Sequence, residues 1–173
     1  MEFRYAILML VLLFGMGFVN AATTYSTSVS FSVSVAEFID VTVSPGSITL
    51  PTINPTENGT ATTPIVVTNT ANSNVPITIS VNGSNFVSGS NTIAITNLRM
   101  RANSAMPDAS AFVDPHFIST TMQSCSASLY SLGQNCYNIP VGSSVNLWFN
   151  LYVPGGQPAG TYTTSLTIKA DRA

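Results

Sequence analysis

The chain has 173 residues, of which 7% are charged, against about 25% in typical soluble domains. Five Lys and Arg residues against seven Asp and Glu residues give a formal net charge of −2. This shortage of cations excludes a basic patch for nucleic acid and a polybasic segment for binding a membrane surface. The apolar content of 45% excludes disorder driven by charge. The length suits one domain with a sizeable core.

Residues 1–21 have the pattern of a secretory signal peptide. Arg4 precedes an apolar run over 6–17, and Val19 and Ala21 occupy the −3 and −1 positions of a cleavage site after Ala21. The competing interpretations are a transmembrane anchor, for which the run is shorter than the about 20 residues needed, and a pilin-type leader cut before the run. The sequence therefore predicts an extracellular or cell-surface protein with no membrane span after cleavage.

After residue 21, apolar residues alternate with polar ones, and helical periodicity is almost absent. The expected strands cover 25–35, 38–43, 47–50, 62–69, 75–81, 91–101, 117–122, 145–153 and 162–170. A phase slip near Thr96 and Asn97 predicts a β-bulge, and residues 102–116 are expected to form a long loop. This pattern predicts an all-β, Ig-like (jelly-roll-like) antiparallel β-sandwich of eight to ten strands over residues 36–173.

Residues 22–35 form an N-terminal segment with the cleanest alternation in the chain. One face carries Tyr25, Thr27, Val29, Phe31, Val33 and Val35, and serines form the other face. An unpaired strand of this kind is an aggregation hazard, so we expect it to pair with its own sandwich or with the open edge of a neighbouring copy. Pairing between copies, repeated head to tail, produces an open filament. The sequence leaves both arrangements open.

Cys125 and Cys136 are the two cysteines of the chain. In a secreted protein they predict a disulfide, which would close a loop of about 12 residues and contribute about 3 kcal/mol by chain entropy. A redox or metal pair is the alternative, but the CxxC spacing of such sites is missing.

The other residues that could bind a metal or take part in catalysis form only weak candidate sites. His116 with Asp108 and Asp114 could be considered as a metal site, but one imidazole and two scattered carboxylates are poor evidence. A hydrolytic triad would have to combine His116 with one of the serines, and the Gly-x-Ser-x-Gly motif of such enzymes is missing. No pair of acids indicates glycoside hydrolysis. Lys169 could form an isopeptide crosslink or be an ordinary exposed lysine. The sequence therefore predicts no enzyme, no cofactor and no metal.

Two kinds of surface site are expected. Asn58 and Asn82 begin Asn-Gly-Thr and Asn-Gly-Ser acceptor sequences in expected turns, so both are candidate glycosylation sites. Trp148 and Tyr152 share the face opposite the apolar stripe of the strand 145–153. If that face is exposed, the two rings form a contact or glycan-binding surface, and if it is covered they are packed.

Three stretches, 34–43, 66–79 and 154–163, carry a resemblance to small secreted β-sandwich surface proteins of archaea and bacteria. The middle stretch is similar to Ig-like repeats, and Pro-Ala-Gly-Thr-Tyr-Thr at 158–163 resembles the ending of many surface domains. The nearest analogy is with subunits of archaeal bundling pili and threads and with TasA- and camelysin-like biofilm-matrix fibre proteins. The resemblance implies assembly by donor-strand complementation, with roughly Thr23–Val35 as the donor.

Two functions are consistent with these observations. The first is an extracellular structural subunit of a pilus, filament or matrix fibre, whose partner is a further copy of the same chain. The low net charge favours it, because copies repel one another little. The alternative is a monomeric cell-surface adhesin or glycan-binding module that uses the Trp148 and Tyr152 face.

Overall fold

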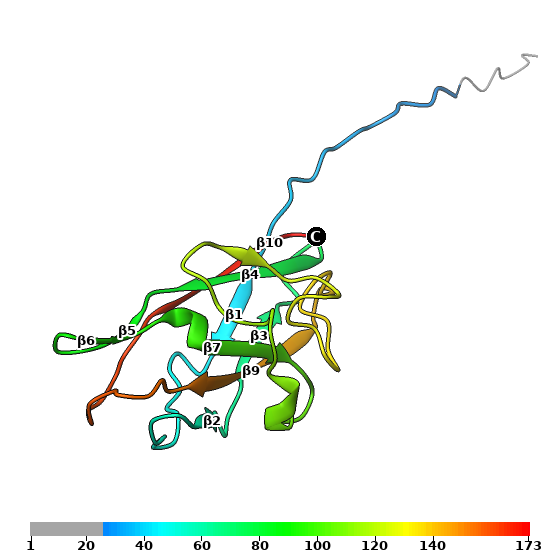
Figure 1. Cartoon of the computed structure of the whole chain (residues 1–173). Helices are drawn as coiled ribbons and strands as arrows, with labels where there is room; N and C mark the ends of the chain where they lie inside the picture. Colours follow the sequence, from blue (N-terminus) through cyan, green and yellow to red (C-terminus); the bar gives the residue numbers. More distant parts are fainter. Residues whose placement is uncertain (1–25) are drawn as a thin grey trace, which may run out of the picture. The chain divides into compact units, whose positions relative to one another are not determined.

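The computed structural model describes residues 26–173, so the predicted signal peptide and Tyr25 lie outside the described residues. Ala36–Ala173 form one compact unit. This unit is built from antiparallel sheets joined by irregular loops, and its described helical elements are short 3-10 turns (Figure 1). The structure thus confirms the prediction of an all-β antiparallel sandwich.

Most strands are short, and the connections 45–57, 103–122, 125–143 and 153–165 between them are long. In chain order they are β1 (Val41–Ser44), β2 (Asn58–Thr60), β3 (Ile65–Asn69), β4 (Ile77–Gly83), β5 (Phe86–Ser88), β6 (Asn91–Ile93), β7 (Leu98–Ala102), β8 (Gln123–Ser124), β9 (Ser144–Tyr152) and β10 (Leu166–Arg172). Two 3-10 turns accompany them, η1 (Ile95–Asn97) and η2 (Ala109–Ala111).

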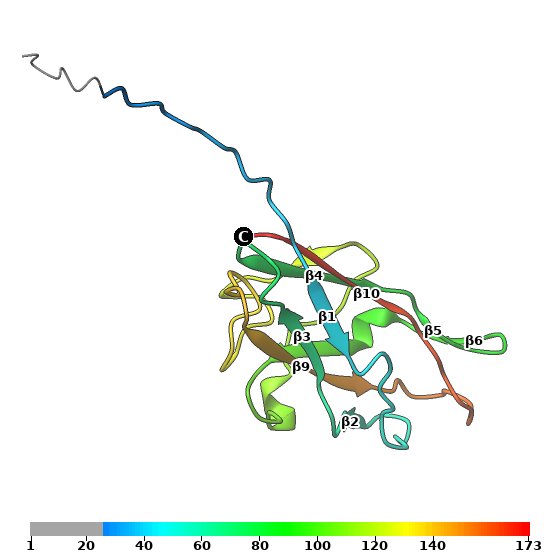
Figure 2. The same ribbon diagram turned by 180° about the vertical axis from the view of Figure 1, so that it is seen from behind.

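The first sheet is organised around β9. Strand β7 pairs with one edge of β9, β3 and β2 pair with successive parts of the other edge, and β1 pairs with β3. The second sheet has the order β10-β4-β8, and β5 and β6 form a separate hairpin. Figures 1 and 2 show these elements from opposite sides. Strands β1 and β10 are therefore edge strands of two different sheets.

The period-two pattern of β9 explains how the core forms. Every second residue of this strand is buried on the inner face: Val145, Leu147, Phe149 and Leu151. The central strand of the second sheet contributes Ile77, Ile79 and Val81 to the same core. Because Cβ atoms alternate between the faces of a sheet, β9 was predictable from its sequence, and its observed bounds differ from the expected 145–153 by one residue.

The expected strand 91–101 is interrupted. It consists of β6, the 3-10 turn η1 and β7, so the phase slip at Thr96 and Asn97 comes from a helical turn and the predicted bulge was wrong. The side chain of Asn85 holds this turn, since its Oδ1 accepts a hydrogen bond of 2.9 Å from the Ile95 N–H.

Two further expected strands, 47–50 and 117–122, form no ladder. Ile48 and Leu50 are half-buried against the core, so the alternation of 47–50 reflects packing without strand pairing. The stretch 117–122 contributes one bridge, between Phe117 and Arg99, before pairing resumes at β8.

Residues 26–35 form no strand, contrary to the expected strand 25–35. Within this segment Val29 is 69% exposed, Phe31 94% and Val33 88%. The described residues of this segment therefore have no regular secondary structure of their own.

The start of β1 is fixed by the turn after β3. One carboxylate oxygen of Asp40 accepts hydrogen bonds from Thr70 Oγ1 at 2.6 Å and from Asn72 Nδ2 at 3.0 Å. Two residues earlier, the Phe38 N–H donates to Asn74 Oδ1 at 2.8 Å. The hydrogen bond from Thr70, and then that from Asn72, lowers the pKa of Asp40 below its ordinary value of 3.8.

Replacement of this carboxylate, Asp40→Asn, is expected to flatten the dependence of stability on acid pH. A carboxyl group whose pKa is lower in the folded state than in the unfolded state stabilises the fold at pH values above the unfolded-state pKa. This contribution is lost as pH falls through the folded-state pKa. Wild type should therefore lose stability below about pH 4, and the variant should lose less. Urea unfolding at a series of acid pH values measures this. Asp108→Asn, on the exposed 102–116 loop, is the control, and equal acid slopes for wild type and Asp40→Asn would contradict the prediction.

Candidate functional site

One side of the sandwich has two open strand edges. Within residues 26–173, β1 pairs only with β3, and β10 pairs only with β4. An ion pair between Glu37 and Arg172 joins the residues before β1 to the end of β10. Figure 2 shows both edge strands on the side that faces the viewer. Free backbone groups at such edges are suited to pairing with another strand.

The inner faces of these two edge strands are only partly covered. Val43 lies opposite the buried Val67 and shares its core-facing side of the sheet, yet it is 43% exposed. On β10, Ile168 lies opposite the buried Val81 but is itself half-buried. We call this region the open side, and its core-facing members are Val41, Val43, Leu166, Ile168 and Ala170.

The disulfide between Cys125 and Cys136 is present, as predicted, with a Cα–Cα distance of 5.6 Å. Both cysteines are buried in the core. The Cys125 N–H donates to the Ile79 carbonyl at 2.8 Å, and the Ile79 N–H donates to the Cys136 carbonyl at 3.0 Å. The disulfide thus fastens the two ends of the 125–136 loop against β4.

Trp148 is packed and does not form an exposed aromatic surface. Only 7% of it is exposed, and its Nε1 donates to the carbonyl of Asn103, on the 102–116 loop, at 2.9 Å. Its register neighbour Arg101 is also buried, and Nε and Nη1 of that guanidinium have no hydrogen-bond partner in the described structure. Desolvation by burial lowers the pKa of Arg101. Of the two predicted surface aromatics, only Tyr152 remains accessible, and it is half-buried.

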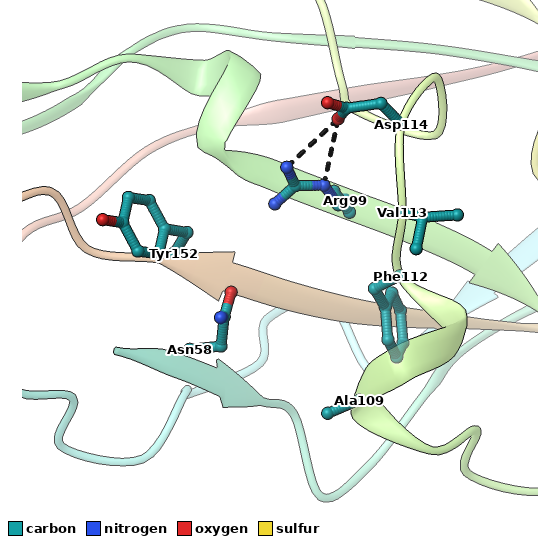
Figure 3. A pocket seen from close by; sticks show the side chains of 7 residues that line it. All are labelled: Asn58, Arg99, Ala109, Phe112, Val113, Asp114 and Tyr152. Carbon is teal, nitrogen blue, oxygen red and sulfur yellow. Dashed lines mark hydrogen bonds and ion pairs between the residues drawn. The ribbon is translucent and has the colours of Figure 1, made fainter. Parts of the chain in front are cut away.

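Tyr152 lines a pocket of about 440 Å³ on the outer face of the first sheet. Figure 3 shows its other lining residues, which come from β2, β7 and the 102–116 loop: Asn58, Arg99, Ala109, Phe112, Val113 and Asp114. Arg99 donates from Nε at 3.3 Å and from Nη2 at 3.1 Å to the same oxygen, Asp114 Oδ1. The pocket therefore contains one ion pair flanked by aromatic and amide side chains.

The structure does not bring the candidate metal ligands together. Asp114 pairs with Arg99, and the ring Nδ1 of the buried His116 lies 2.7 Å from the Val113 carbonyl oxygen. Among residues 26–173, no three His, Cys, Asp or Glu side chains are grouped for a metal ion. Lys169 Nζ lies 2.7 Å from the carboxylate of Asp171 and forms an ordinary surface ion pair.

The two candidate glycosylation sites lie on strands and not in the expected turns. Asn58 is exposed on β2 and lines the pocket. Asn82 is on β4, where its Nδ2 donates to the Thr120 carbonyl at 3.1 Å and its Oδ1 is buried. The amide of Asn82 is therefore engaged by the fold, whereas that of Asn58 is accessible.

The chain matches no family model and no curated protein. Among solved structures it is similar to a family 123 glycoside hydrolase from Clostridium perfringens, studied for glycolipid glycan hydrolysis, at 13% identity and a TM-score of 0.45. The similarity covers 77% of this chain and 24% of the hydrolase, so the chain spans about a quarter of that protein. A likeness of this size assigns neither an activity nor a family.

In the part of the chain that the structure describes, no helix has the length and hydrophobicity to span a membrane.

Proposed function

We propose that this protein is an extracellular structural subunit of a pilus, filament or matrix fibre, and that it has no catalytic role. In the assembly, the N-terminal segment of one copy adds as a strand to the open side of the next copy. The observation that carries the proposal is that residues 26–35 expose an alternating apolar face, while the edge strands β1 and β10 leave their core-facing side chains half covered.

The N-terminal segment and the edge strand β10 have matching lengths. From Val29 to Val35 there are six residue steps, and from Leu166 to Arg172 there are also six. At about 3.3 Å per residue, each extended stretch is about 20 Å long. Every second residue of the segment would face the core-facing side chains of the open side, and the serines between them would face solvent.

Strand addition supplies what each part lacks. The segment would gain main-chain hydrogen bonds and bury four apolar side chains, each worth about 1.5–3 kcal/mol when fully buried. Because a donor on one copy meets an acceptor on the next, the contact is heterologous and extends into a filament. The disulfide is in keeping with an oxidising, extracellular location.

Deletion of residues 23–35 tests the proposal. We expect the mature chain from Ala22 to form filaments visible by negative-stain microscopy, and the deleted chain to remain monomeric because it retains the acceptor and lacks the donor. Size-exclusion chromatography measures the assembly state, and near-ultraviolet circular dichroism with thermal unfolding checks that the sandwich is folded.

The control is built into the fold, since Ala36–Ala173 form the compact unit and contain the complete core. A wild-type chain that stays monomeric at all concentrations, or a deleted chain that still forms filaments, would contradict the proposal.

A further inference from the structure

The pocket beside Tyr152 has polar groups that the fold itself does not use. Both hydrogen bonds of the ion pair end on Asp114 Oδ1. Within residues 26–173, Asp114 Oδ2, Arg99 Nη1, the Asn58 amide and the Tyr152 hydroxyl therefore remain available for a ligand. The side chain of Asp114 is 72% exposed and that of Arg99 is 22% exposed, so the pair faces solvent at the mouth of the pocket.

The charge of the pocket favours an uncharged ligand. Among the described residues, Arg99 and Asp114 are the only charged ones that line it, and they neutralise each other. An anion would have to compete with Asp114 for the guanidinium, and a cation would have to compete with Arg99 for the carboxylate. A hydroxyl group, in contrast, both donates and accepts, so it can bind beside the ion pair without breaking it.

The walls of the pocket suit a ring with apolar C–H faces. Figure 3 shows Tyr152 on one side and Phe112 on the other, with Arg99 and Asp114 above and Asn58 below. Val113, which is 53% exposed, extends the apolar wall next to Phe112. Phe112 is only 5% exposed, so Tyr152 and Val113 are the accessible apolar walls of a shallow, open space of about 440 Å³ toward which the polar groups converge.

From this geometry we propose that the pocket binds an uncharged saccharide residue. The hydroxyl groups of the sugar contact Arg99, Asp114 and Asn58, and its ring packs against Tyr152 and Val113. This ligand has two possible sources with the same chemistry. It belongs to a glycan of the surroundings, or it is attached to Asn58 itself, because Asn58-Gly59-Thr60 is an acceptor sequence at the wall of the pocket.

The first experimental arm uses the unglycosylated mature chain. We expect neutral oligosaccharides on a glycan array to bind, and isothermal titration to give an affinity that falls about tenfold or more in Asp114→Ala and in Tyr152→Ala. Tyr152→Phe, which keeps the ring, should lose less. Asp108→Ala is the matched control, since it removes an exposed carboxylate of the same loop that does not line this pocket.

The second arm uses the chain secreted by a host that glycosylates Asn-x-Ser/Thr sites. Mass spectrometry should find the glycan on Asn58. Asp114→Ala should then be made in two backgrounds, the glycosylated protein and the Asn58→Gln variant, which carries no sugar at this site. It should lower the thermal midpoint more in the glycosylated protein, because only there does Asp114 contact a sugar.

The two arms separate the sources of the ligand. Binding in the first arm assigns the pocket to an external glycan, and a glycan-dependent effect of Asp114→Ala in the second assigns it to the sugar on Asn58. If no neutral saccharide binds and the effect of Asp114→Ala is the same with and without the glycan, the proposal is overturned.

Discussion

A single charge on the apolar face of the N-terminal segment, Phe31→Asp, is expected to abolish self-assembly without unfolding the sandwich. Phe31 is 94% exposed and does not belong to the sandwich core, so the core keeps its packing. In the proposed assembly, its ring would be buried, which stabilises the contact by about 1.5–3 kcal/mol, and a buried unpaired carboxylate would cost several kcal/mol more. The affinity between copies should therefore fall by more than about 100-fold. Analytical ultracentrifugation over a concentration series measures this change.

A second variant tests the other side of the same contact, the open side that accepts the segment. Val43→Asp changes a core-facing residue of the open side that is 43% exposed, so the fold should tolerate it. Each variant alone is expected to be monomeric, because one lacks a donor and the other lacks an acceptor. Mixed in equal amounts, they should form a heterodimer and nothing longer, since the intact donor of Val43→Asp meets the intact acceptor of Phe31→Asp.

The matched control is Ser32→Asp, which adds the same charge to the opposite face of the segment. It should assemble like wild type, because residue 32 faces solvent in the proposed strand. Assembly by Phe31→Asp at wild-type concentrations, or equal loss of assembly in Ser32→Asp, would mean that the apolar face does not make the contact.

The sequence was informative where one face of a strand is buried and the other is not. In β9 the alternation identified Val145, Leu147 and Phe149 as core residues, and all three are buried. The two cysteines of a chain with a predicted signal peptide were sufficient to predict their disulfide. The pattern of β9 lies within a few consecutive residues, and the two cysteines have no competing partners in the sequence.

The covering of an outer face was not predictable in the same way. Alternation placed Trp148 and Tyr152 on one face, but it carries no information on what lies above that face. The 102–116 loop covers Trp148 through the hydrogen bond to Asn103 and leaves Tyr152 at the edge of the pocket. Whether an aromatic side chain of this face is buried or exposed depends on the path of the 102–116 loop. The loop has no periodic sequence pattern from which its path could be predicted.

The pocket was missed for a related reason. Its residues are distant in sequence, from Asn58 through Arg99 and Asp114 to Tyr152, and none belongs to a motif with fixed spacing. The sequence offers Asp114 only as a metal ligand beside Asp108 and His116, and no sequence pattern singles out Arg99. The register of β7 and β2 on β9, which brings Arg99 and Thr60 on either side of Asn150, is long-range information that the alternation of single strands does not contain.

The largest loss of stability is expected from removal of the disulfide in the double variant Cys125→Ala and Cys136→Ala. Opening a loop of about 12 residues costs about 3 kcal/mol of unfolding free energy by chain entropy. The loop also holds Tyr130, which is fully buried and whose hydroxyl oxygen lies 2.7 Å from Gln123 Oε1 and 3.0 Å from the Phe117 carbonyl oxygen. Loosening it therefore loosens a core side chain. In a domain of this size the thermal midpoint should fall by about 6–12 °C.

Reductant supplies the control for this prediction. Reduced wild type should unfold at nearly the same urea concentration as the double variant, and the double variant should not respond to reductant. Urea unfolding followed by circular dichroism, with and without reductant, compares the four conditions. The free energy of unfolding that remains in the reduced protein then measures what the two sheets contribute without the disulfide. Ile79, whose backbone hydrogen-bonds to both cysteines, should stay in β4 because this strand pairs with β10. If wild type, reduced wild type and the double variant all unfold together, the disulfide is not the constraint that fixes the 125–136 loop against the core.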